Sequence, residues 1–104
     1  MTTKASVDAR AHLEKKFGQL TLAMVIRSTR ECDDVSQTDF AKKLGVTRAH
    51  LCDVEAGRKA VSPARAWEWA KKLGYLPQQW AELALQDQLE REGLKGVRVR
   101  LEVA

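Results

Sequence analysis

Two cysteines and two histidines are the residues of this sequence best suited to bind a metal or to act as nucleophiles. Cys32 and Cys52 form no C-x-x-C pair, and His12 and His50 lie too far apart to indicate a local zinc site. There is also no G-x-S-x-G, H-E-x-x-H or P-loop motif. The sequence therefore predicts no metal site and no cofactor, and it disfavours an enzyme. We expect the two cysteines to be reduced, partly buried thiols.

A different chemistry is indicated by residues 36–57, where two short apolar patterns are separated by a very short turn. Two helices joined in this way must cross steeply. Ala41 is small enough for the close crossing, and Gly45 tolerates the positive φ that the turn needs. The side chains predicted to face the core are Phe40, Leu44, Val46, Leu51 and Val54.

These residues resemble the helix-turn-helix of the phage repressor and Cro family of transcriptional regulators. The matching positions are Gln37, Ala41, Gly45, Leu51, Val54 and the segment Glu55-Ala-Gly57. The family commonly pairs an arginine at the end of the preceding helix with that glutamate, and Arg30 lies at the matching position. The resemblance covers roughly residues 22–83 and implies that Arg30, Ala41, Gly45 and Glu55 have structural roles, with Arg30 and Glu55 meeting at a partly buried junction.

The resemblance also implies that the second helix lies in the DNA major groove, with its first residues near base edges. The candidate readers are then Thr47, Arg48, Ala49 and Asp53. An arginine fork suits guanine, and an alanine suits the thymine methyl group. Asp53 departs from the usual pattern. It is expected either to accept from cytosine N4 or to form an ion pair with Arg48 or Lys59.

Other polar residues are candidates for the DNA backbone. Gln37 is expected to meet it at the start of the first helix of the pair. His50 is expected to point outward, toward solvent or a phosphate. Four cations are either phosphate contacts or plain solvated surface, namely Lys42, Lys43, Arg58 and Lys59.

The elements that position these residues are predicted to form an all-α, five-helix domain. Helical patterns cover residues 20–30, 36–45, 47–55, 62–73 and 77–91, with Ser36, Thr47 and Ser62 as caps and Gly45, Gly57 and Gly74 as stops. An extra helix is predicted over residues 6–17. The predicted organisation is an N-terminal extension (1–18), the DNA-binding domain (19–92) and a C-terminal β-strand (93–104).

The C-terminal strand is predicted from alternating apolar residues, Val97, Val99, Leu101 and Val103. A lone strand needs a partner outside the monomer or a helix surface that covers it. The last helix has a core stripe of Leu76, Trp80, Leu83 and Ala84 and a second stripe of Ala81, Leu85 and Leu89. We therefore expect two copies to pair their tails as an antiparallel ribbon on Leu85 and Leu89.

The chain has 104 residues, of which 44% are hydrophobic and 31% charged, with a net charge of +4. These values fit one globular domain, and no apolar run reaches the roughly 18 residues of a membrane span. The expected protein is a cytoplasmic, homodimeric repressor that binds double-stranded DNA. Two alternatives remain open. One is an antitoxin that binds a toxin and represses its own operon. The other is an interaction module that has lost DNA binding, since charges nearly balance over residues 27–59.

Overall fold

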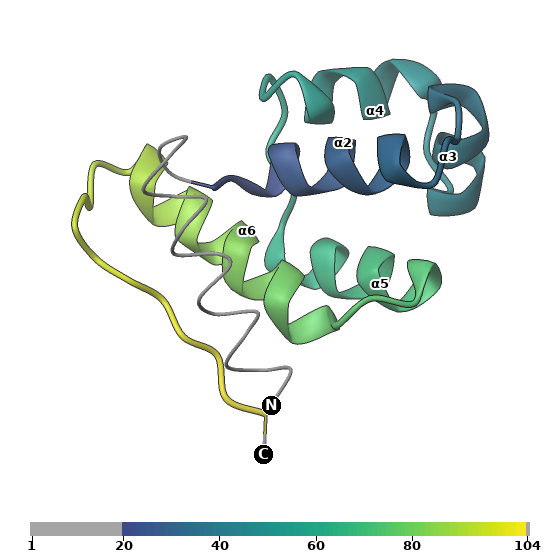
Figure 1. Ribbon diagram of the computed structural model, residues 1–104. Helices are drawn as coiled ribbons and strands as arrows, with labels where there is room; N and C mark the ends of the chain where they lie inside the picture. The colour runs from purple at the N-terminus through teal and green to yellow at the C-terminus, as the bar shows by residue number, and fades with distance from the viewer. Residues whose placement is uncertain (1–19, 104) are drawn as a thin grey trace.

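A computed structural model describes residues 20–103 of the chain, and its secondary structure there is helical throughout. In Figure 1, α2, α3 and α4 lie together on one side of the molecule, and α5 and α6 pack beneath them. The helices are α2 (Leu22–Cys32), α3 (Gln37–Leu44), α4 (Arg48–Glu55), α5 (Pro63–Leu73) and α6 (Pro77–Arg91). The all-α prediction with five helices over this part of the chain is confirmed.

Side-chain caps determine where four of these helices begin. The hydroxyl groups of Thr21, Ser36, Thr47 and Ser62 each accept a hydrogen bond from the backbone N–H three residues later, at 3.1–3.2 Å. Such bonds satisfy amides that have no partner within the helix. The three predicted caps are confirmed. Thr21 is the cap that sequence analysis missed, and it moves the start of α2 to Leu22.

The core gathers apolar side chains from all five helices. Phe40, Ile26, Leu51 and Val54 are the largest of its fully buried side chains, and Trp69 and Trp80 are also buried. Leu76 was predicted to belong to this core, and that prediction is wrong, because its side chain is 62% exposed. Leu76 precedes the first turn of α6 as its N-cap, so the helical periodicity does not extend to it.

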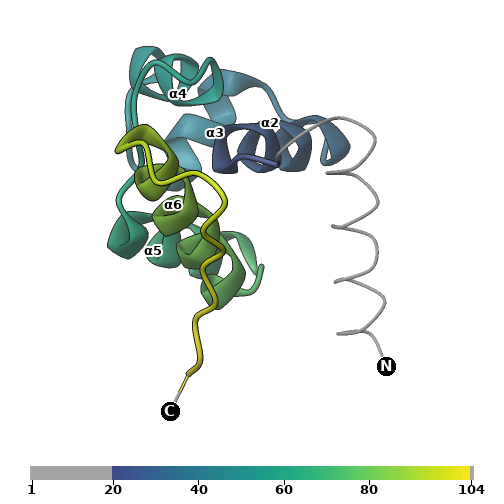
Figure 2. The ribbon, with the colours of Figure 1, turned by 90° about the vertical axis from the view of Figure 1, so that its left-hand side faces the viewer.

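The predicted C-terminal β-strand is also wrong for the chain as described. Residues 97–103 run as extended chain along α6, as Figures 1 and 2 show, without a strand assignment. A strand is defined by its ladder to another strand, and no other segment in residues 20–103 is a strand. Side chains of α6 satisfy the tail backbone instead. The predicted helix over residues 6–17 lies outside the described residues.

Within residues 20–103, none of the helices combines the length and the apolar character that crossing a membrane requires.

Candidate nucleic-acid interface

The turn between α3 and α4 has the geometry that its sequence demands. Gly45 adopts φ +76°, in the left-handed region that favours glycine. The backbone then reverses, and the Val46 N–H donates to the Ala41 carbonyl at 3.0 Å. Ala41 is buried, as expected for a small residue at a close helix crossing. Together, α3 and α4 form the helix-turn-helix.

A hydrogen-bonded cluster around Glu55 joins α2, α3 and α4. The Arg30 guanidinium donates to both Glu55 carboxylate oxygens, at 2.8 and 3.1 Å, and to the Val35 carbonyl at 3.1 Å. The Glu55 side chain is only 4% exposed and the Arg30 side chain 15%. Hydrogen bonding to Glu55 raises the pKa of Arg30 above its usual value. This geometry matches the junction that the resemblance implied for Arg30 and Glu55.

Gln37 belongs to the same cluster. Its side-chain amide donates to Glu55 Oε1 at 3.1 Å, so the residue expected at the DNA backbone is partly engaged inside the protein. The amide nitrogen carries two N–H groups, and one of them remains for a further acceptor. Gln37 therefore links the start of α3 to the end of α4.

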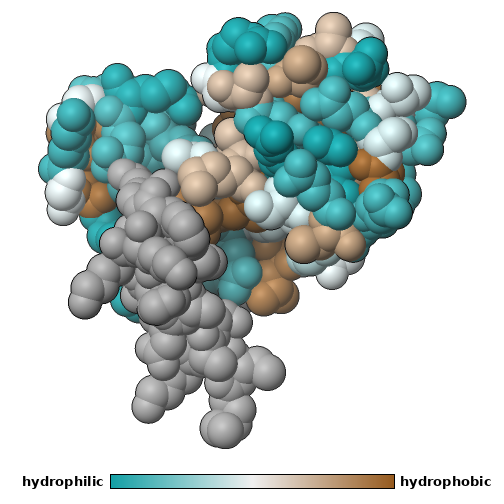
Figure 3. All heavy atoms as spheres, turned by 45° about the horizontal axis from the view of Figure 1, so that its top comes forward, coloured by the Kyte–Doolittle hydropathy of each residue, from teal (hydrophilic) through white to brown (hydrophobic). Residues whose placement is uncertain are grey.

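The first turn of α4 presents its side chains to solvent. Thr47, Arg48 and Ala49 are all exposed, and Thr47 uses its hydroxyl to cap the His50 amide. The Arg48 guanidinium makes no hydrogen bond or ion pair with the described residues, which leaves all of its donors available. Figure 3 shows that the surface on this side of the molecule is mostly hydrophilic.

Three lysines at the end of α3 and after the end of α4 are similarly available. Lys42 and Lys43 lie in the last turn of α3, and Lys59 lies in the loop after α4. All three are exposed, and none makes an ion pair within residues 20–103. Lysines placed in this way can contact phosphates at little desolvation cost.

The structure gives Asp53 a partner that the sequence did not indicate. Its carboxylate accepts from Arg58 Nε at 2.9 Å, rather than pairing with Arg48 or Lys59. The Asp53 carbonyl also accepts from the backbone N–H groups of Arg58 and Lys59. Hydrogen bonding to Asp53 raises the pKa of Arg58. The turn after Glu55 folds the chain back over α4, which explains why two residues five apart in sequence meet.

His50 lies half-buried between α4 and α5, in contrast to the outward position expected for it. Its ring packs edge-on against Trp69, with the centroids 6.4 Å apart, and its Nε2 is 3.4 Å from Arg65 Nη1. A guanidinium only donates, so Nε2 must act as the acceptor in this contact. The Arg65 guanidinium also lies 6.0 Å from the Trp69 ring centroid. Sequence analysis missed Arg65, since no local pattern connects it to a histidine on another helix.

The two cysteines differ in their exposure to solvent. Cys52 is half-buried, with its Sγ 3.7 Å from Arg58 Nη2, and Cys32 is exposed. No group of His, Cys, Asp and Glu side chains in the described part of the chain is arranged to hold a metal ion.

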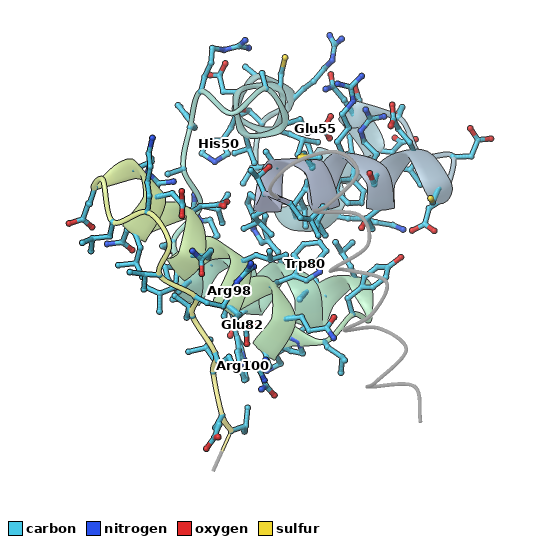
Figure 4. The ribbon with its side chains drawn as sticks, turned by 60° about the vertical axis from the view of Figure 1, so that its left-hand side comes forward. His50, Glu55, Trp80, Glu82, Arg98 and Arg100 are labelled. Carbon is cyan, nitrogen blue, oxygen red and sulfur yellow. The ribbon has the colours of Figure 1, made fainter. Side chains whose placement is uncertain are left out.

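Figure 4 shows Arg98 and Arg100 of the tail beside Glu82 of α6, away from the end of α4 at Glu55.

Comparison with known proteins identifies this arrangement. A family model described as helix-turn-helix matches residues 26–80, which is slightly more than half of the chain. No match was found among curated proteins or among solved structures. The matched region begins in α2 and ends in α6, and it contains the turn at Gly45 and the Arg30–Glu55 pair. The chain belongs to the Cro/C1-type helix-turn-helix family of DNA-binding regulators.

Proposed function

We propose that the protein is a sequence-specific repressor that binds double-stranded DNA in the cytoplasm as a homodimer and occludes a promoter. The observation that carries this proposal is the exposed first turn of α4, with an unpaired Arg48 at its start. In a helix-turn-helix, this is the turn that approaches base edges in the major groove. One such module covers a short half-site, so useful specificity calls for two copies.

The proposed readers are Thr47, Arg48 and Ala49. Arg48 is assigned the principal role, because its free guanidinium can donate to O6 and N7 of one guanine. Ala49 provides an apolar contact for a thymine methyl group, and Thr47 is placed to bond a base edge or a phosphate. Asp53 is 34% exposed and bound to Arg58, so its proposed role is to hold Arg58 at the end of α4.

Phosphate contacts are proposed for Lys43 and Lys59, with Lys42 beside them. Arg58 can add a further contact, because its bonds to Asp53 and Cys52 use only part of its five N–H donors. Gln37 can reach a phosphate with the N–H that Glu55 does not hold. His50 is proposed to act indirectly, by orienting Arg65 at the first turn of α5.

The near balance of basic and acidic residues over 27–59 favours one alternative, a protein-interaction module without DNA binding. The pairing of Asp53 with Arg58 leaves this balance unchanged, because the pair has no net charge. An antitoxin that represses its own operon keeps the same DNA-binding surface and adds a toxin as partner. A small toxin-like reading frame beside the gene would favour it.

A salt titration tests the proposal. The protein should shift a random-sequence duplex at low salt, and the affinity should fall steeply as salt rises, because bound lysines and arginines displace counterions. Absence of binding at low salt, or binding that does not respond to salt, would favour the interaction module.

A further inference from the structure

The tail is held on α6 by side chains that act as a hydrogen-bonding ladder. The Gln86 amide donates to the Val97 carbonyl at 2.6 Å and accepts from the Val99 N–H at 2.8 Å. The Leu101 N–H donates to Glu82 Oε2 at 3.0 Å, and the Gln78 amide donates to the Leu101 carbonyl. We call Gln78, Glu82 and Gln86 the α6 ladder. Gln86 is only 2% exposed, so its amide depends on these bonds.

The spacing of the α6 ladder matches an extended chain. Its members lie four residues apart, which is about 6 Å along a helix. Gln86 binds Val97 and Val99, whereas Glu82 and Gln78 both bind Leu101. The bound residues therefore extend over about 13 Å of extended chain, which is close to the roughly 12 Å between Gln78 and Gln86 along the helix. Side chains of α6 thus take the place of a neighbouring strand. They form hydrogen bonds with the backbone groups of the odd-numbered residues Val97, Val99 and Leu101.

The opposite edge of the tail is different. In an extended chain the N–H and C=O groups of successive residues point to opposite sides. The groups of Arg100 and Glu102 therefore point away from α6, and within the described residues neither residue makes a hydrogen bond or an ion pair. A row of free backbone groups of this kind is a template for pairing with another chain.

We infer that this outer edge binds the same edge of a second copy, antiparallel, so that a two-stranded ribbon forms between two α6 helices. The charges of the tail favour a second copy of the same tail as the partner. Because the edge belongs to even-numbered residues, Arg100 can lie opposite Glu102 of the second copy, and Glu102 opposite its Arg100. The two-fold axis then passes through Leu101. The alternative register that places Arg100 opposite itself brings like charges together.

The apolar side chains of the tail agree with this register. Val103 is 61% exposed in the single chain, and the register places it opposite Val99 of the second copy. Leu101 lies opposite its own equivalent. The inference deepens the proposed function, because it names the surface through which the proposed homodimer forms. Its tests use no DNA, so they succeed or fail independently of DNA binding.

Amide hydrogen exchange gives a direct test. In dilute protein, the Val99 and Leu101 amides should exchange slowly and the Arg100 and Glu102 amides quickly. At concentrations where sedimentation shows a dimer, the Arg100 and Glu102 amides should become protected as well. Protection that does not change with concentration in a dimeric sample would overturn the inference.

A charge exchange tests the register. Arg100→Glu and Glu102→Arg should each raise the dimer dissociation constant about tenfold, because each places two like pairs in the ribbon. The double variant Arg100→Glu/Glu102→Arg should restore dimerisation. Neither residue has a partner within the described chain, so folding should be unaffected, and an unchanged melting temperature checks this. A protein that stays monomeric at high concentration, or a dimer that survives deletion of residues 95–104, would contradict the inference.

Discussion

At the scale of single residues, the Glu55 carboxylate joins three helices through its bonds to Arg30 and Gln37. Glu55→Ala would leave the largely buried Arg30 guanidinium without its counter-charge. We expect a loss of about 3–5 kcal/mol in the free energy of unfolding, because the remaining charge stays desolvated. Chemical denaturation measures it, and a cycle with Arg30→Ala isolates the coupling between the two residues.

Arg27 and Glu31 provide the matched control on the same helix. They form an ion pair at 3.4 Å, but both side chains are more than half exposed. Glu31→Ala should therefore cost no more than roughly 0.5 kcal/mol. Equal losses for Glu55→Ala and Glu31→Ala would show that the Glu55 cluster does not stabilise the fold.

Arg48 is the residue on which sequence reading is proposed to depend. Arg48→Ala should cost roughly 1–3 kcal/mol on the specific site and relax the preference at one base pair. Lys43→Ala should instead weaken specific and random DNA alike and lower the salt slope by about one. Binding titrations with both duplexes measure the difference. An equal loss for Arg48→Ala on the two duplexes would reduce Arg48 to a phosphate contact.

Some residue contacts could be predicted from sequence and others could not. The Arg30–Glu55 pair could be predicted because the family that the sequence resembles commonly pairs an arginine and a glutamate at these two positions. The Asp53–Arg58 and His50–Arg65 contacts could not, because they depend on how the loop after α4 folds back and on where α5 packs. The Asp53–Arg58 contact replaces the ion pair that was expected with Arg48 or Lys59. The His50–Arg65 contact replaces the outward position that was expected for His50.

At the scale of elements, the turn at Gly45 determines the angle between α3 and α4. A Cβ at this position would have room, since its nearest neighbour is Lys72 Nζ at 3.7 Å. Gly45→Val should nevertheless destabilise the protein by about 1–2 kcal/mol or more, because a β-branched residue is strained at φ +76°. DNA affinity should fall with it, since α4 loses its position.

Gly45→Asn is the control for this variant, because asparagine tolerates the left-handed region better than valine does. It should retain most of the melting temperature and most of the DNA affinity. An unchanged melting temperature for Gly45→Val would mean that the turn does not constrain the two helices.

The helices were predictable because their caps and stops are local signals, and Ser36, Thr47 and Ser62 lie where their hydroxyl groups act. The tail was not predictable in the same way. Alternation at period two indicates an extended chain, but it does not identify what satisfies the backbone. Here the partner is a row of side chains on α6, formed by Gln78, Glu82 and Gln86.

At the scale of the whole molecule, the surface proposed to read DNA and the surface proposed to dimerise belong to different helices. The first turn of α4 carries the readers, whereas the tail runs along α6 (Figure 2). Separate surfaces allow two copies to associate through the tails while both α4 helices stay exposed. The net charge of +4 suits binding to DNA, but the position of the free cations near α4 does more to locate the contact.

Selection of bound sequences from a random pool of duplex DNA tests directly whether two copies read a specific sequence. One motif should be enriched, with two-fold symmetry and with half-sites about 34 Å apart on one face of the duplex. The same selection with Arg48→Ala should lose the preference at one position in each half-site. A pool that remains random after repeated selection at low salt would contradict sequence-specific binding.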